Sequence, residues 1–398
     1  MIVPNSERKR NFILGVIFGI LLYLQMLLQN LANLSLIGPI GNNVKYFYIF
    51  IFIISLVLNI NYIKDLVYFI PFVFFGIFSY SILKDMSVVG LFLVAFSLRR
   101  IEVYNILKIF FYTYWSLFTT MMCFLFLRIT TNIYQTSLYG EGQGWTFGFS
   151  NHNAIGRVLM TGCMINLVIR LVEKKKYSKF HLIIWWATQI ILYYILFLTS
   201  SSSAIIAMVI SLLCYLFISK FSWINRAKKA KLLGWASYSV LIGGIIFTLL
   251  SLTEKVFDTG SFWYTLNKLM TGRLALGELN NKIFGLSIWG NPAFIPSTEN
   301  VPNYTLGFSY NFVDNSYLFV MMRYGSVFLV LLTIYYLMLI RKIVFNEFLP
   351  LFIPVITLSF YGIAENIIYS YAANCVLLWL GIWLFSTKAE IKFVKDRR

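Results

Sequence analysis

The chain has 398 residues, of which 59% are hydrophobic and 12% charged, and its formal net charge at pH 7 is +18. Its mean hydropathy is +0.77, far above the range of soluble globular proteins. This composition excludes an ordinary soluble domain and indicates a polytopic membrane protein.

Runs of about 20 mostly apolar residues can cross the hydrocarbon core of a bilayer. The sequence contains about twelve such runs, which predicts an all-α polytopic membrane protein with about twelve spans. In chain order they cover residues 12–30, 44–62, 66–83, 87–98, 106–128, 153–171, 181–198, 203–219, 232–252, 313–340, 349–364 and 367–386. The run at 87–98 is short, and the runs on either side of "TSSSS" could be re-entrant or one broken helix.

Charge along the chain predicts the orientation of these spans. The first apolar run is long and lacks a small-residue cleavage pattern after it, so it is expected to stay as an anchor. With the N-terminus inside, most of the 33 Lys and Arg fall in cytoplasmic segments. Both termini are therefore expected in the cytoplasm of a cell-membrane protein. The net charge is interpreted as a topology signal and an attraction to anionic lipids, and no nucleic-acid partner is expected.

No separate soluble domain is predicted, so residues 1–398 are treated as one membrane domain. Its longest polar stretch, residues 253–312, is expected to be a large extracytoplasmic loop. Helical spacing of apolar residues in "GSFWYTLNKLMTGRLALGELNNKIFG" predicts one or two short amphipathic helices on the membrane surface, with Thr271 available as an N-cap. The four cysteines lie in predicted spans and suggest neither disulfides nor a metal site.

The stretch "FGFSNHNAIGR" places polar residues at the start of a predicted span. Asn153 and Arg157 are four residues apart and so project from one side of a helix. An arginine one turn into the membrane is a candidate functional residue, although it could also extend its guanidinium back to the interface. His152 is a weaker candidate for substrate contact, because a loop histidine is commonly a polar interface residue.

Asp314 is the strongest candidate for a catalytic acid or base among the carboxylates. At the end of the large loop its carboxylate could act as a general base, or it could cap the next helix together with Asn315. Arg323 lies nine residues further on, on the opposite side of a helix, and either packs as a structural arginine or supports substrate binding. Glu278 and Glu365 are further carboxylates on the outer side, each of which could equally be a solvated interface residue.

Several motifs are absent from the sequence. It contains no DxD pair, HExxH, Cys and His cluster or GxxxxGK[ST], so no metal and no cofactor are expected. Cations for a phosphate would come from Arg157, Arg273 and Arg323. Trp145 and Trp263 could stack on sugar rings.

Four stretches in this order resemble the O-antigen polymerase and O-antigen ligase superfamily, which includes the Wzy-type polysaccharide polymerases of capsules. They are "TFGFSNHNAIGRVL", "FLTSSSSAIIAMVI", "LMTGRLALGELNNKIFGLSIWG" and "FVDNSYLFVMMRYGSVFLVLL". The resemblance implies a glycosyltransferase similar to the GT-C class. Such an enzyme transfers a growing chain from undecaprenyl diphosphate to a lipid-linked oligosaccharide repeat unit outside the membrane, by inverting and metal-independent chemistry. A chain-length regulator is a further expected partner.

The resemblance also implies residue roles. Arg273 would match the loop arginine that holds the diphosphate, Asn153 and Arg157 would match part of the substrate cradle, and Asp314 would stand where the ligases usually have a histidine. Ser202 replaces an arginine found in many relatives. The alternatives are an O-antigen-type ligase, which differs in its acceptor, and a flippase for lipid-linked oligosaccharides.

Overall fold

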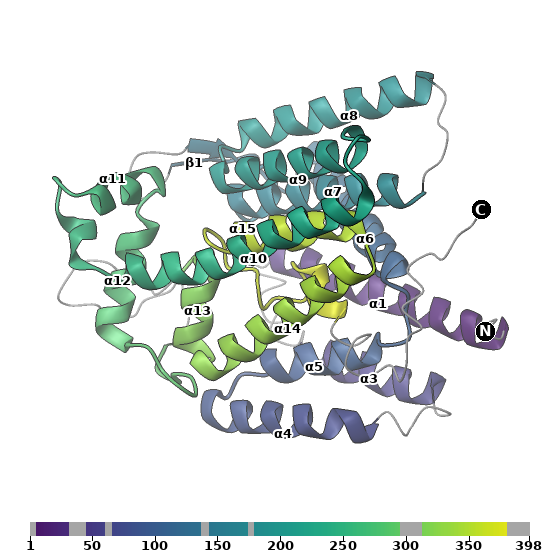
Figure 1. Ribbon diagram of the computed structural model, residues 1–398, viewed down its shortest axis with the longest axis horizontal. Helices are drawn as coiled ribbons and strands as arrows, with labels where there is room; N and C mark the ends of the chain where they lie inside the picture. Colours follow the sequence, from purple (N-terminus) through teal and green to yellow (C-terminus); the bar gives the residue numbers. More distant parts are fainter. Residues whose placement is uncertain are drawn as a thin grey trace.

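The computed structural model describes residues 5–31, 45–59, 66–136, 143–173, 179–294 and 313–379. These parts of the chain are almost entirely helical, and the helices pack into a bundle with the described N-terminal end and the loop helices at opposite ends (Figure 1). The helices that precede the first hairpin are α1 (Asn5–Leu31), α3 (Lys45–Leu58), α4 (Leu66–Leu83), α5 (Ser87–Ser97) and α6 (Val103–Phe126).

A small antiparallel hairpin of β1 (Tyr134–Thr136) and β2 (Gln143–Trp145) follows α6. The next elements are α7 (His152–Glu173), α8 (Lys179–Leu198), α9 (Ser202–Lys220), α10 (Arg226–Ser251), the 3-10 helix η2 (Glu254–Phe257), α11 (Phe262–Leu269) and α12 (Arg273–Phe284). The last are α13 (Ser316–Arg323), α14 (Ser326–Phe345), the 3-10 helix η3 (Leu349–Leu351) and α15 (Phe352–Tyr361).

The described helices agree with an all-α membrane protein. Seven of them are long and apolar enough to cross a membrane: α1, α6, α7, α8, α9, α10 and α14. Four shorter apolar helices, α3, α4, α5 and α15, match the predicted runs at 44–62, 66–83, 87–98 and 349–364. The two runs beside "TSSSS" form separate helices, α8 and α9. The predicted run at 367–386 continues beyond residue 379 and so lies partly outside the described residues.

Helix α7 lies at the centre of the bundle and is the most buried of the seven long helices. It packs against α6, α8, α9 and α15, while α10 packs against α13, α14 and α15. Helix α8 is peripheral and leaves Ile183, Ile190 and Phe197 exposed, as expected for a surface in contact with lipid. A charged residue on α7 is therefore at least partly enclosed by other helices, where an ionic partner stabilises it.

The predicted single span at 313–340 is wrong, because the chain breaks into α13 and α14 at Gly325. This glycine has φ +93°, and a Cβ there would lie 2.4 Å from the carbonyl oxygen of Ile288. The segment that follows α12 crosses the break, and its Ser287 carbonyl accepts a hydrogen bond from the Ser326 amide. Only glycine allows both the left-handed backbone and this close approach.

The large loop contains two short helices, α11 and α12, where the sequence predicts one or two. The N-cap position of α12 is Gly272, with φ +82°, so the prediction of Thr271 as the cap is wrong. Ser261 caps α11 by accepting a hydrogen bond from the Tyr264 amide. Residues 295–312 of the predicted loop lie outside the described residues.

Candidate active site

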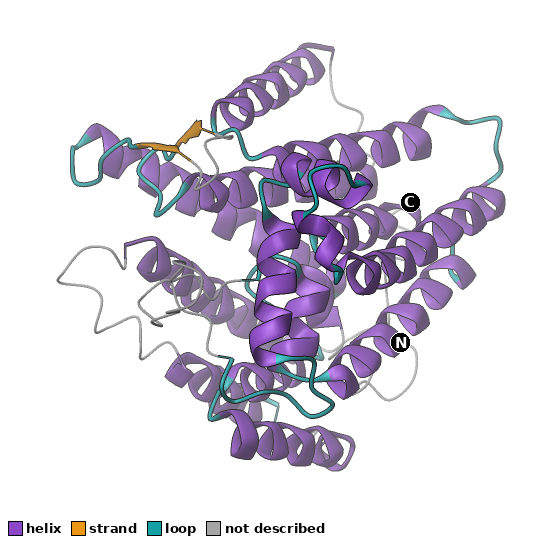
Figure 2. Ribbon diagram, turned by 90° about the vertical axis from the view of Figure 1, so that its left-hand side faces the viewer, coloured by secondary structure: helices purple, strands orange, loops and turns teal. Residues whose placement is uncertain are grey.

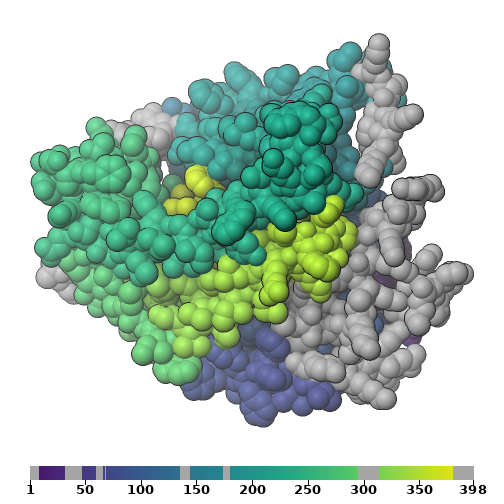
Figure 3. All heavy atoms as spheres, in the orientation of Figure 1, coloured from purple at the N-terminus to yellow at the C-terminus, as the bar shows by residue number. Residues whose placement is uncertain are grey.

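Four charged side chains meet at the end of the bundle where α11 and α12 lie, which is the end that faces the viewer in Figure 2. They are Arg157 of α7, Arg273 at the start of α12, Asp314 just before α13 and Glu365 in the turn after α15. We call these four residues the charged cluster. Figure 3 shows the yellow C-terminal part of the described chain at the floor of an opening between the green loop helices and the teal helices.

Arg273 joins the two carboxylates of the charged cluster. Its Nε donates to Oδ2 of Asp314 at 2.9 Å, and its Nη2 donates to Oε1 of Glu365 at 2.8 Å. Only 11% of its side chain is exposed. Burial lowers the pKa of Arg273, but Glu365 and Asp314 outweigh this effect and hold the pKa above its usual value. Arg273 is therefore a permanent cation fixed in orientation by both acids.

Glu365 is the most buried member of the charged cluster, with 3% of its side chain exposed. Its Oε1 accepts hydrogen bonds from Arg273 and from Ser203 Oγ, the latter at 3.1 Å. Burial raises the pKa of Glu365 above its ordinary value, against the lowering effect of Arg273 and Arg157. This carboxylate is thus easier to protonate than an exposed glutamate.

Arg157 is held less firmly than Arg273. Its Nη2 lies 3.9 Å from Oε2 of Glu365, which is an ion-pair distance but too long for a hydrogen bond. Its Nε is buried without a hydrogen-bond partner among the described residues, and 35% of its side chain is exposed. Arg157 therefore keeps donor groups that an incoming anion could use.

Asn315, and not Asp314, caps α13. The Asn315 side chain accepts hydrogen bonds from the amides of Tyr317 and Leu318, so it is the N-cap of α13, and it also bonds to Thr248 of α10. Asp314 instead directs its carboxylate to Arg273, with 18% of its side chain exposed. Asn315 therefore takes the capping role that was the alternative prediction for Asp314. Asp314 instead faces the other members of the charged cluster.

Ser316 links the two segments that carry Asp314 and Glu365. Its hydroxyl donates to the carbonyl oxygen of Glu365 and accepts from the amides of Ile367 and Ile368. Because Ser316 follows Asp314 by two residues, these bonds tie the turn that carries Glu365 to the segment that carries Asp314. The two carboxylates are thereby placed on either side of Arg273.

The start of α7 packs against the "TSSSS" turn that precedes α9. Asn153 Oδ1 accepts a hydrogen bond from Ser201 Oγ at 3.1 Å, and a Cβ on Gly156 would lie only 2.6 Å from the same Oγ. His152 begins α7, is half-buried and lies within electrostatic range of Arg273. Asn153 and His152 are thus neighbours of the charged cluster, on the same helix end as Arg157.

Arg323 lies apart from the charged cluster. Its Nη1 donates to the carbonyl of Phe294 at 2.9 Å, its Nη2 donates to the carbonyl of Leu83 at 3.2 Å, and Asp85 is 3.6 Å away. These contacts join the segment after α12 to the turn between α4 and α5. The structure therefore places Arg323 in the packed structural role rather than beside the other two arginines.

Glu278, Trp263 and Trp145, the remaining predicted site residues, make no hydrogen bond or ion pair with the charged cluster in the described structure. Glu278 is buried on α12, and its Oε2 has no hydrogen-bond partner in the described part of the chain. Trp263 packs against Phe247, whereas Trp145 on the hairpin pairs with Tyr134 and is 38% exposed. Of the two tryptophans, Trp145 is the more exposed.

Sequence reasoning did not give Glu365 the central place that it has in the charged cluster. Its closest cationic partner is 92 residues away in the sequence, so no local spacing reveals the pair. The only signal was an acid between two apolar runs. Within the described ranges, no group of three His, Cys, Asp or Glu side chains is arranged to hold a metal ion.

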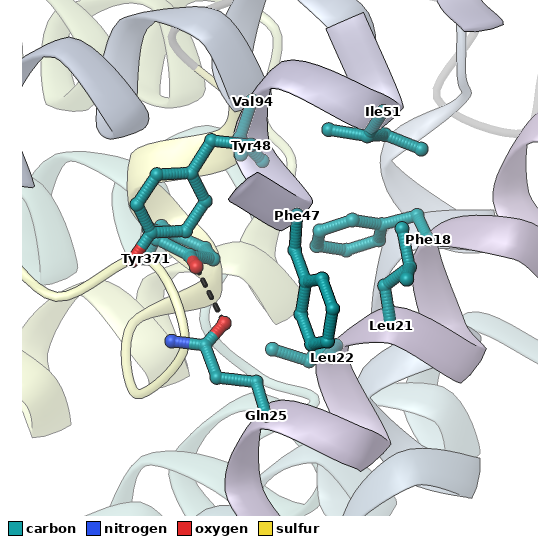
Figure 4. Close-up of a pocket in the computed structure, with 9 residues that line it drawn as sticks. All are labelled: Phe18, Leu21, Leu22, Gln25, Phe47, Tyr48, Ile51, Val94 and Tyr371. Carbon is teal, nitrogen blue, oxygen red and sulfur yellow. Dashed lines mark hydrogen bonds between the residues drawn. The ribbon is translucent and has the colours of Figure 1, made fainter. Parts of the chain in front are cut away.

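A cavity away from the charged cluster lies between α1, α3 and α5 and is closed on one side by Tyr371 (Figure 4). Its volume is about 10 Å³, which leaves room for no more than a water molecule. Apart from the hydrogen bond between Tyr371 and Gln25, its lining is almost entirely apolar. This cavity is too small to accept a sugar or a diphosphate.

Comparison of the chain with models of known protein families, with curated proteins and with solved structures finds no match. The resemblance of its four sequence stretches to the O-antigen polymerase and ligase superfamily therefore stays a prediction from the sequence.

Proposed function

We propose that the protein is a polysaccharide polymerase that joins undecaprenyl-diphosphate-linked oligosaccharide repeat units at the outer face of the cytoplasmic membrane. The observation that carries this proposal is Arg273, held between Asp314 and Glu365 beside Arg157. Charged residues enclosed among apolar helices are costly, and their retention is typical of a functional site.

Two arginines provide the positive charge that a diphosphate leaving group requires. Arg273 has its orientation set by two acids, and Arg157 has donor groups available. As the bond between the sugar and the diphosphate breaks, negative charge grows on the leaving oxygen. Arginines already fixed nearby stabilise that charge without a cost of reorganisation at the moment of reaction.

Asp314 is the better placed of the two acids to act on a substrate. Its side chain is 18% exposed against 3% for Glu365, and its Oδ1 makes no hydrogen bond within the described part of the chain. In the proposed step, an acceptor hydroxyl oxygen bonds to the anomeric carbon as the bond from that carbon to the diphosphate oxygen breaks. The hydroxyl proton passes to Asp314, and the lipid diphosphate leaves.

The position of the charged cluster suits a donor that stays in the membrane. The cluster lies at one end of a bundle whose described part has seven potential membrane-crossing helices, on the side of the amphipathic α11, whose Phe262 and Leu269 are exposed. A diphosphate attached to a membrane lipid would be at this depth, near the interface. The same position fits an acceptor that is also lipid-linked.

The test is to size the lipid-linked glycans and the surface polymer in cells that carry Asp314→Asn or Arg273→Gln. Single repeat units that accumulate at the outer face support the polymerase. Long chains that are not transferred to their final acceptor would assign a ligase, and units retained at the inner face would assign a flippase. Lys282→Gln is a matched control, because Lys282 is a cation of α12 whose ion pair in the described structure is with the exposed Glu254, away from the charged cluster.

A further inference from the structure

We infer that Glu365 is an exchangeable counter-ion of Arg157 and Arg273, which takes up a proton when a diphosphate diester binds beside these arginines. Anion binding and protonation would then be coupled in this site. The inference rests on the proposed function, because it takes the bound group to be a lipid-linked diphosphate.

The charge balance of the charged cluster leads to this inference. Two arginines face two carboxylates, so the cluster is neutral before any ligand arrives. A diphosphate diester adds two negative charges beside Asp314 and Glu365, which are 18% and 3% exposed, and an excess of charge next to largely buried carboxylates is expensive. Loss of one carboxylate charge reduces the excess and releases an arginine for the ligand.

Glu365 is the acid that contacts both arginines. Its protonation would weaken its hydrogen bond from Arg273 and its pairing with Arg157, and the phosphate oxygens of the ligand would take its place. Its Oε2 faces Arg157 at 3.9 Å, so that pairing has no hydrogen bond to break. On Oε1, the Ser203 hydroxyl now donates, but a hydroxyl can rotate and accept a hydrogen bond instead. A protonated Glu365 would therefore keep a partner inside the protein. Burial also raises the pKa of Glu365, in the direction that the exchange requires.

The experiment needs controls, because other charged or titratable groups near Glu365 could also change their protonation on binding. Those that face it are Arg157 from α7, Ser203 from α9, Arg273 from α12, Asp314 before α13 and Tyr361 from α15. Beyond them, Tyr114 of α6 lies near Arg157, and His152 lies near Arg273. His152 is the neighbour whose ordinary pKa is close to neutral, so it is the main alternative source of a proton signal.

The experiment is titration calorimetry of the purified full chain in detergent, in two buffers of different ionisation enthalpy. The probe is a short prenyl-diphosphate-linked monosaccharide, because its diphosphate diester does not itself titrate in the range used. We expect up to one proton to be taken up per ligand bound. Inside the window between the pKa values of Glu365 without and with ligand, the dissociation constant should rise about tenfold per pH unit.

Two variants and a second anion complete the test. Glu365→Gln should bind without proton uptake and with an affinity independent of pH, whereas His152→Gln should take up a proton on binding as the wild type does. Binding without proton uptake in the wild type, uptake that persists in Glu365→Gln, or uptake lost in His152→Gln would overturn the inference. If Glu365→Gln does not fold, the number of protons taken up by the wild type and by His152→Gln still tests the inference. Equal binding of free sulfate would overturn the assignment to a lipid-linked ligand.

The outcomes also separate this inference from the proposed function. A chain that lengthens lipid-linked glycans but takes up no proton on binding would keep the polymerase and overturn the exchange at Glu365. A chain that binds the probe with proton uptake but never lengthens glycans would support the exchange and overturn the polymerase.

Discussion

Arg273 and Asp314 are 41 residues apart in the sequence, yet Nε of the arginine donates to Oδ2 of the aspartate at 2.9 Å. This bond joins the start of loop helix α12 to the segment that leads into α13. The same guanidinium reaches Glu365 through Nη2, so one side chain connects three separate parts of the fold.

The first prediction concerns the geometry of this guanidinium. Arg273→Lys keeps the charge but cannot donate along two fixed directions to Asp314 and Glu365. We expect polymer formation to fall by about a hundredfold or more, the scale seen when a fixed charge-stabilising donor is lost. Polymer amount per molecule of membrane-inserted protein is the measurement. Lys282→Gln is the control and should form polymer normally. Full activity of Arg273→Lys would show that positive charge at this position is sufficient for polymer formation, whatever its hydrogen-bond geometry.

A second prediction concerns Ser316, which ties the turn of Glu365 to the segment of Asp314. Ser316→Ala removes one donor and leaves the amides of Ile367 and Ile368 without their acceptor. The expected loss of stability is about 1 to 3 kcal/mol. Ser81→Ala is the control, because the exposed Ser81 makes only a local bond to Phe78. Equal melting temperatures for the two variants in detergent would contradict the role of Ser316.

The packing of α7 on the "TSSSS" turn gives a third prediction. Gly156→Ala would place a methyl group 2.6 Å from Ser201 Oγ and 2.7 Å from its Cβ, so we expect a destabilisation of about 1 to 3 kcal/mol. Ser201→Gly in the same chain should restore part of the loss. Gly243→Ala, where no atom lies within 4 Å, should be neutral or slightly stabilising. Thermal unfolding of these variants decides between steric conflict and a general intolerance of alanine in the helices.

A fourth prediction separates Arg323 from the charged cluster. Arg323→Gln leaves buried carbonyls and Asp85 without a cation, and breaking such a buried pair costs about 3 to 5 kcal/mol. We expect less folded protein but unchanged activity per folded molecule. Arg226→Gln, which removes an exposed pair with Glu347, should change stability by less than about 1 kcal/mol. A loss of activity in Arg323→Gln without a loss of stability would instead indicate substrate contact.

Much of the helical framework could be predicted from apolar run lengths, as for α4 at residues 66–83. The break at Gly325 could not, because it depends on a segment that arrives from a distant part of the chain. Arg157 stood out in the sequence, since a charge within an apolar helix is rare. Glu365 did not, because its meaning comes from Arg273 and Ser203, which only the tertiary fold brings beside it.

The most direct test of the proposed polymerase is a polymerisation assay with the purified chain and one synthetic lipid-linked repeat unit. We expect the wild type to form a ladder of lipid-linked products longer than the starting unit. Asp314→Asn, which keeps the shape of the side chain but removes its negative charge, should form none while retaining the wild-type melting temperature within a few degrees. A wild type that forms no ladder would contradict the proposed polymerase activity. An Asp314→Asn variant that forms the same ladder would contradict the role of Asp314 as the base.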